Sequence, residues 1–109
     1  MMLNNMKGGK MKTAPEILDE MRTTYIERNK VYGNNYLAVG KCMKVLFPKG
    51  VVLNDANSFM IWHLFELLIV KITLFSFSNL NHKDSIHDAA VYCAMIEEAM
   101  NLIKESEGG

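Results

Sequence analysis

Residues 59–77 read FMIWHLFELLIVKITLFSF, and this stretch decides the fold. Apolar side chains fall on every side of a helical wheel here, and only His63, Glu66 and Lys71 are ionisable. His63, Glu66 and Thr73 lie within about 80° of one another on that wheel, so they form one polar seam along the helix. A helix that is apolar all round is either buried in protein or embedded in a membrane. Three ionisable groups near its middle argue against a span, because each costs about 2.5–3.5 kcal/mol at the centre of an inserted helix. We therefore expect a long central helix, surrounded by its own chain and by a second copy.

Composition points to a small, self-associating protein of the cytoplasm. The length of 109 residues suits one domain, and half of those residues are apolar. In a short chain, such an excess is commonly covered by the interface of a symmetric homodimer. Twelve basic and twelve acidic residues balance, so the charge gives no sign of nucleic-acid binding. Cys42 and Cys93 have no metal-type spacing, and both are expected to be reduced and buried.

The N-terminal half of the chain predicts two helices. Residues 1–12 lack the apolar core of a signal peptide and are expected to form a disordered leader. Thr13 and Glu16 have the spacing of a capping box, in which the Thr13 hydroxyl accepts a backbone amide while Glu16 reaches back. The helix that they open should end near Val31 or Tyr32, before a glycine. A shorter helix is expected over Asn35–Leu46, ended by Phe47-Pro48-Lys49-Gly50.

The C-terminal half predicts two longer helices. Asn54 or Asp55 caps the central helix, which should run to about Phe77. Asp84 or Ser85 starts the last helix, which is expected to reach about Lys104 and to leave residues 105–109 as a flexible tail. Its predicted apolar face comprises Ile86, Ala89, Ala90, Cys93, Ile96, Met100 and Ile103. The expected architecture is an all-α bundle of four helices in a single domain over residues 13–104.

Polar side chains interrupt the last helix where it should face the central one. Asp84 and Asp88 are four residues apart, hence on one face, and Tyr92 follows one turn later. Two like charges at this spacing repel unless a positive group lies near them. That group is Lys71, a metal ion, or the helix N-terminus, whose dipole favours acids in the first turn. An alternative reading is purely structural. Glu66 and Lys71 would pair with neighbouring helices, His63 would form a hydrogen bond in the core, or these polar residues would only join two copies of the chain.

Carboxylates from two facing helices are suitable ligands for Mg²⁺, which takes one or two of them together with waters and substrate phosphates. The candidate metal ligands are Glu66 on the central helix and Asp84 and Asp88 on the last. The sequence contains no glycine-rich phosphate loop, no nucleophile elbow and no zinc-type cluster. His82 and His87 lie beside these acids and are expected to be exposed.

Three motifs in this order resemble a family of small phage and prophage proteins close to the MazG-like all-α nucleotide pyrophosphohydrolases. They are ILDEM at 17–21, ERNKVYGNN at 27–35 and HKDSIHDAAVYCAMI at 82–96, the last two separated by the long apolar helix with its lysine. The resemblance covers about residues 15–99. Its most specific parts are Tyr32-Gly33 and the run from Asp84 to Tyr92, which is similar to the acidic helix of the MazG-like enzymes.

The resemblance implies a MazG-like bundle that binds a nucleotide with Mg²⁺ and hydrolyses a nucleoside triphosphate to monophosphate and pyrophosphate. It implies catalytic roles for Glu66 and Asp88, and a metal set of Glu66, Asp84 and Asp88. Lys71 would contact phosphate, and Tyr32 or Tyr92 would border the base. Ser85 stands where the family's glutamate is usual, and His63 stands where one of a pair of glutamates is usual.

Those two departures support a second hypothesis of a different class. In it the chain is a catalytically inactive helical binding protein, which sequesters a nucleotide or contacts a host factor. Under either hypothesis we expect a homodimer in the cytoplasm of a bacterial host, with no membrane and no nucleic acid as partner.

Overall fold

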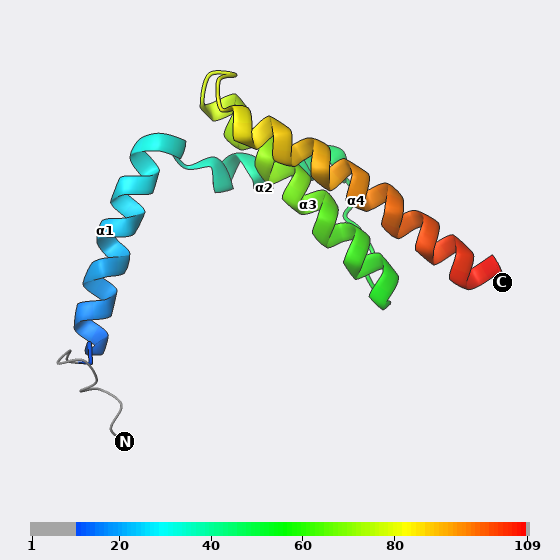
Figure 1. Cartoon of the computed structure of the whole chain (residues 1–109), viewed down its shortest axis with the longest axis horizontal. Coiled ribbons are helices and arrows are strands. Elements are labelled where there is room, and N and C mark those ends of the chain that lie inside the picture. Colours follow the sequence, from blue (N-terminus) through cyan, green and yellow to red (C-terminus); the bar gives the residue numbers. More distant parts are fainter. Residues whose placement is uncertain (1–10, 109) are drawn as a thin grey trace. The chain divides into compact units, whose positions relative to one another are not determined.

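The computed structural model describes residues 11–108, which form four helices and no strand. In chain order the helices are α1 (Ala14–Tyr32), α2 (Asn35–Leu46), α3 (Ala56–Phe77) and α4 (Lys83–Gly108) (Figure 1). The prediction of an all-α chain with four helices is confirmed. The predicted leader lies outside the described residues as far as residue 10.

The chain divides into two compact units, the first ending at Val31 and the second beginning at Tyr32. The first unit contains α1 up to that boundary, and no residue of α1 is buried. The second contains α2, α3 and α4, and α3 contacts both of the others. The single domain expected over residues 13–104 stays a prediction.

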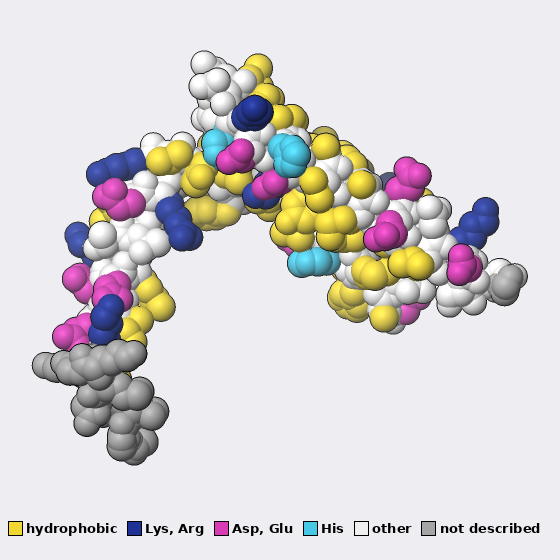
Figure 2. Space-filling view, viewed as in Figure 1, with side chains coloured by type: hydrophobic (Ala, Val, Ile, Leu, Met, Phe, Trp, Pro, Cys, Tyr) yellow, Lys and Arg dark blue, Asp and Glu magenta, His cyan; other side chains and the backbone are white. Residues whose placement is uncertain are grey.

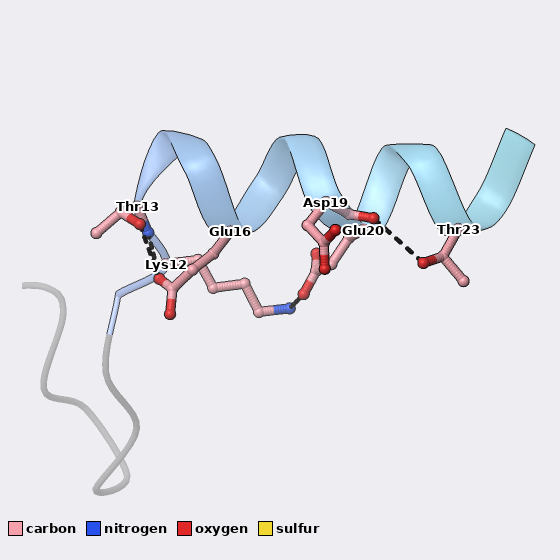
Figure 3. A network of polar contacts seen from close by, with 6 residues as sticks. All are labelled: Lys12, Thr13, Glu16, Asp19, Glu20 and Thr23. Carbon is pink, nitrogen blue, oxygen red and sulfur yellow. Dashed lines mark hydrogen bonds and ion pairs between the residues drawn. The ribbon is translucent and has the colours of Figure 1, made fainter.

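The start of α1 is fixed by its own side chains (Figure 3). Glu16 Oε1 accepts hydrogen bonds from the Thr13 amide at 2.7 Å and from the Thr13 hydroxyl at 3.0 Å. These bonds lower the pKa of Glu16. The Thr13 hydroxyl therefore donates to Glu16, whereas the predicted capping box had it accepting a backbone amide. Lys12 forms an ion pair with Glu20, whose hydrogen bond and charge raise the pKa of Lys12.

The start of α3 is fixed by Asp55, one of the two predicted caps. Asp55 Oδ1 accepts from the Ser58 amide at 2.8 Å, and the Asp55 amide donates to Ser58 Oγ at 3.2 Å. Hydrogen bonds from Ser58 lower the pKa of Asp55, so the cap is present above the ordinary pKa of an aspartate and is lost as the pH falls through the lowered value. The helix ends at Phe77, as predicted.

The contact between α3 and α4 is made through small residues. The buried residues of α3 are Leu64, Ile69 and Thr73, and those of α4 are Ser85, Ala89 and Ala99. The predicted apolar face of α4 was partly wrong, because Ile86, Ala90, Cys93 and Met100 are exposed in this chain. Small side chains let two helices approach closely, so they take the positions that face α3 while bulkier residues stay outside. Cys93 was expected to be buried and is exposed, and Cys42 is half-buried.

The last helix is longer than expected. It continues to Gly108, whereas the sequence predicted an end near Lys104 followed by a flexible tail. Residues 105–107 are Glu-Ser-Glu, which contain no helix breaker, and the first glycine comes only at position 108.

The chain itself buries little of α3. By length and composition, α3 would suit a membrane span, as do the core helices of many soluble proteins. Only 17% of its most apolar window is buried inside the chain. The helices α2 and α4 therefore leave much of the apolar surface of α3 exposed.

Candidate functional site

The charged contact between α3 and α4 joins Lys71 and Asp88. Lys71 Nζ lies 3.1 Å from Asp88 Oδ2, and the two side chains are 27% and 44% exposed. Among residues 11–108 it is the ion pair that links two different helices. The sequence allowed Lys71, a metal ion or the helix N-terminus as the positive group beside Asp88, and in the structure Lys71 occupies that position. Its ammonium compensates the carboxylate of Asp88 directly.

The other two candidate metal ligands do not join this pair. Glu66 and Asp84 are both exposed, and the part of the chain that the structure describes contains no group of three or more His, Cys, Asp or Glu side chains placed to hold a metal ion. Mg²⁺ would have to compete with Lys71 for Asp88. The residues of one chain therefore do not fit the Mg²⁺ site that the resemblance implies.

The predicted polar seam along α3 is realised only in part. Thr73 is buried, with Oγ1 donating to the Val70 carbonyl at 2.8 Å and accepting from Asn35 Nδ2 at 3.3 Å. His63 and Glu66 were expected on the same seam but are exposed. The seam thus joins α2 to α3 at Thr73, and no carboxylate takes part in that junction.

Sequence reasoning missed a polar cluster at the start of α4. His82 Nδ1 and Ser85 Oγ share a hydrogen bond of 2.5 Å, and Ser85 is almost completely buried. The ring of Tyr32 meets His82 edge-on, with the two centroids 5.9 Å apart. His82 was expected to be exposed and is half-buried. The three-residue spacing of His82 and Ser85 across a helix start, which is that of a capping box, was the available signal.

Tyr32, one of the two tyrosines predicted to border a base, belongs to this cluster. Tyr32 lies against His82, next to Gly33, which adopts a positive φ of 61°. A Cβ at Gly33 would come within 3.3 Å of the Phe77 ring, so glycine is favoured there by conformation and by space. Tyr92, the other candidate, is half-buried on α4, one turn after Asp88. The described contacts thus give Tyr32 a structural role.

The second unit also has an apolar hollow between α2 and α3. It measures about 320 Å³ and is lined by Lys41, Cys42, Val45, Leu46, Ile69 and Ile72. No residue of α2 is buried. On the face of the molecule drawn in Figure 2, hydrophobic side chains are also exposed over α3 and α4. Lys41 is the one charged residue of the lining.

Comparison with protein-family models, with curated proteins and with solved structures gave no match. The MazG-like resemblance therefore stays a prediction that rests on the motifs quoted above.

Proposed function

We propose that this chain is a catalytically inactive helical binding protein that takes an amphipathic helix of a partner protein between α2 and α3. The observation that carries the proposal is the exposed hollow with five apolar or sulfur-bearing lining residues and one lysine. A groove between two helices with these properties suits the apolar face of a third helix. The lysine favours a partner helix with an acidic residue at its edge.

The charge of α2 argues for a different chain as the partner. α2 contains Lys41 and Lys44 and no acid. A symmetric pairing of two copies through this surface would bring lysine toward lysine, which costs binding energy. A foreign helix with acidic residues avoids that repulsion.

The proposal of inactivity rests on the acids. A pyrophosphohydrolase of the MazG type would need its carboxylates gathered around metal, and here Asp88 is paired with Lys71 while Glu66 and Asp84 are exposed. Ser85 and His63, which stand where the MazG-like family usually has glutamates, also support the proposal of inactivity.

A pair of designed helical peptides tests this function. Both carry the same apolar face, and one is flanked by glutamates while the other is flanked by lysines. We expect the acidic peptide to bind more tightly, and we expect Lys41→Glu to reverse the preference. Val45→Glu should weaken binding at least tenfold, because it places a charge inside an apolar contact. Isothermal titration calorimetry gives the dissociation constants.

Val52→Glu is the matched control. Val45 and Val52 are 77% and 78% exposed, but only Val45 lines the hollow. Absence of binding by both peptides, or an equal loss in the two valine variants, would overturn the proposal.

Nucleotide binding at the seam between α3 and α4 is a second candidate, favoured by the position of Lys71. Its ammonium is accessible and is compensated by a single carboxylate, so a phosphate oxygen of similar geometry can replace Asp88. We propose that Lys71 would contact the phosphate, with Tyr92 one turn from Asp88 at the edge of the site.

Two substitutions separate a phosphate contact from a metal site. If Lys71 alone holds phosphate, Asp88→Ala should preserve or raise nucleotide affinity, because it frees the ammonium, whereas Lys71→Met should abolish binding. If Mg²⁺ at Asp88 carries the nucleotide, Asp88→Ala should abolish both binding and any pyrophosphate release. Equilibrium dialysis of nucleoside triphosphates with and without Mg²⁺ provides the measurement, with Lys104→Met as control. Wild-type protein that binds no nucleotide would eliminate this candidate.

A further inference from the structure

We propose that α1 pairs in antiparallel orientation with α1 of a second copy of the chain. This inference goes beyond the proposed function, because it assigns a partner to a different surface. It rests on an apolar stripe, on the distribution of charge along the helix, and on the position of two charged residues beside the stripe.

The stripe consists of Ile17, Met21 and Tyr25, four residues apart and therefore on one face. These side chains are 38%, 59% and 53% exposed. Together with Glu20, Thr24 and Arg28 they border a shallow hollow of about 470 Å³ along the helix. Figure 2 shows hydrophobic side chains gathered along one side of α1. In proteins, most of the stability of a helix comes from packing of its apolar face, and no residue of α1 is buried, so this face needs a cover.

Charge is distributed asymmetrically along α1. Residues 14–21 carry three acids and no base, while residues 22–32 carry three bases and one acid. The helix dipole favours this order in any single helix. The dipole does not, however, require an acid and a base beside the apolar stripe, where Glu20 and Arg28 both line the hollow, eight residues apart.

Antiparallel pairing uses that arrangement. A two-fold axis at the middle of the hollow, between residues 22 and 23, sets the acidic half of each helix against the basic half of the other. Met21 is then level with Thr24 of the second copy. Glu20 and Arg28 of the second copy are offset by three residues, about 4.5 Å along the axis, which their side chains can span. A parallel pair would instead place Glu20 against Glu20 and Arg28 against Arg28.

The two residues are available for this contact. Arg28 has no ion-pair partner within residues 11–108. Glu20 is paired with Lys12 at the exposed start of the helix, and exposed pairs of this kind contribute little. The symmetric pair therefore contains two Glu20–Arg28 contacts, one on each side of the axis.

Charge reversal in the full chain tests the pairing. In E20K, each introduced lysine would meet Arg28 of the second copy, and in R28E each Glu20 would meet an introduced glutamate. We expect both variants to self-associate at least tenfold more weakly than the natural chain. Mixed in equal amounts, the two variants should associate with each other. In the mixed pair, the introduced lysine of one copy meets the introduced glutamate of the other, and Arg28 of the first copy meets Glu20 of the second. Both contacts therefore join opposite charges. Sedimentation equilibrium, with one variant carrying a fluorophore, measures all three affinities.

Asp19→Lys is the matched control. It makes the same change in charge as E20K, but Asp19 lies on the opposite side of the helix from the stripe. It should leave self-association unchanged. If E20K and R28E associate as tightly as the natural chain, or if they bind each other no better than themselves, the stripe belongs to another occupant and the pairing is wrong.

Discussion

Replacing Leu64 by alanine is expected to destabilise the second unit by about 2–5 kcal/mol. Leu64 is one of four apolar side chains that are buried in the described chain, together with Ile69, Ala89 and Ala99. Two of those four are alanines, so the leucine provides a large part of the buried apolar surface. Truncation removes its transfer free energy and leaves a cavity beside α3. Urea unfolding followed by circular dichroism measures the loss as a lower transition midpoint at unchanged slope.

Leu102→Ala provides the comparison for that experiment. Both leucines lie on the long helices, but Leu64 is 8% exposed and Leu102 is 60% exposed. A surface truncation usually changes stability by less than about 0.5 kcal/mol. If the two variants lost the same stability in dilute protein, the core assigned to Leu64 would be wrong.

The bounds of the first three helices could be predicted because their causes are local. Asp55 caps α3 through a residue three positions away, and Phe47-Pro48 interrupts the chain after α2. Gly33 adopts the positive φ that suits a residue just past the end of α1. Each of these signals is complete within a few residues, so no knowledge of distant contacts is needed.

The rotation of the helices about their axes could not be predicted in the same way. α3 is apolar on every side, so its sequence has no periodicity that shows which residues face α4, and Glu66 was placed on an inner seam although it is exposed. On α4, Ile86 and Met100 suggest an apolar face, but the buried positions belong to smaller residues such as Ala89 and Ala99. Close approach of two helices, rather than hydrophobicity, decides that face.

The candidate site was predicted in part for the same reason. Lys71 was one of the positive groups considered for Asp88, and the structure brings the two together at 3.1 Å. The His82–Ser85 hydrogen bond was missed although its three-residue spacing is a local signal. The contact of Tyr32 with His82 joins residues far apart in sequence, so only the structure shows it.

Self-association is the second large effect that we expect. No residue of α1 is buried, and its stripe residues Ile17, Met21 and Tyr25 are 38%, 59% and 53% exposed. Complete burial of a large apolar side chain contributes about 1.5–3 kcal/mol, so covering several half-exposed ones outweighs the cost of association. The melting temperature should therefore rise with protein concentration, because dissociation precedes or accompanies unfolding.

The central claim is that a second copy of the chain covers the apolar stripe of α1. Sedimentation equilibrium of the full chain over a hundredfold range of concentration tests it most directly. The chain has a mass of 12.4 kDa, and we predict twice that mass or a larger multiple, falling on dilution. A mass of 12.4 kDa at every concentration would contradict the claim.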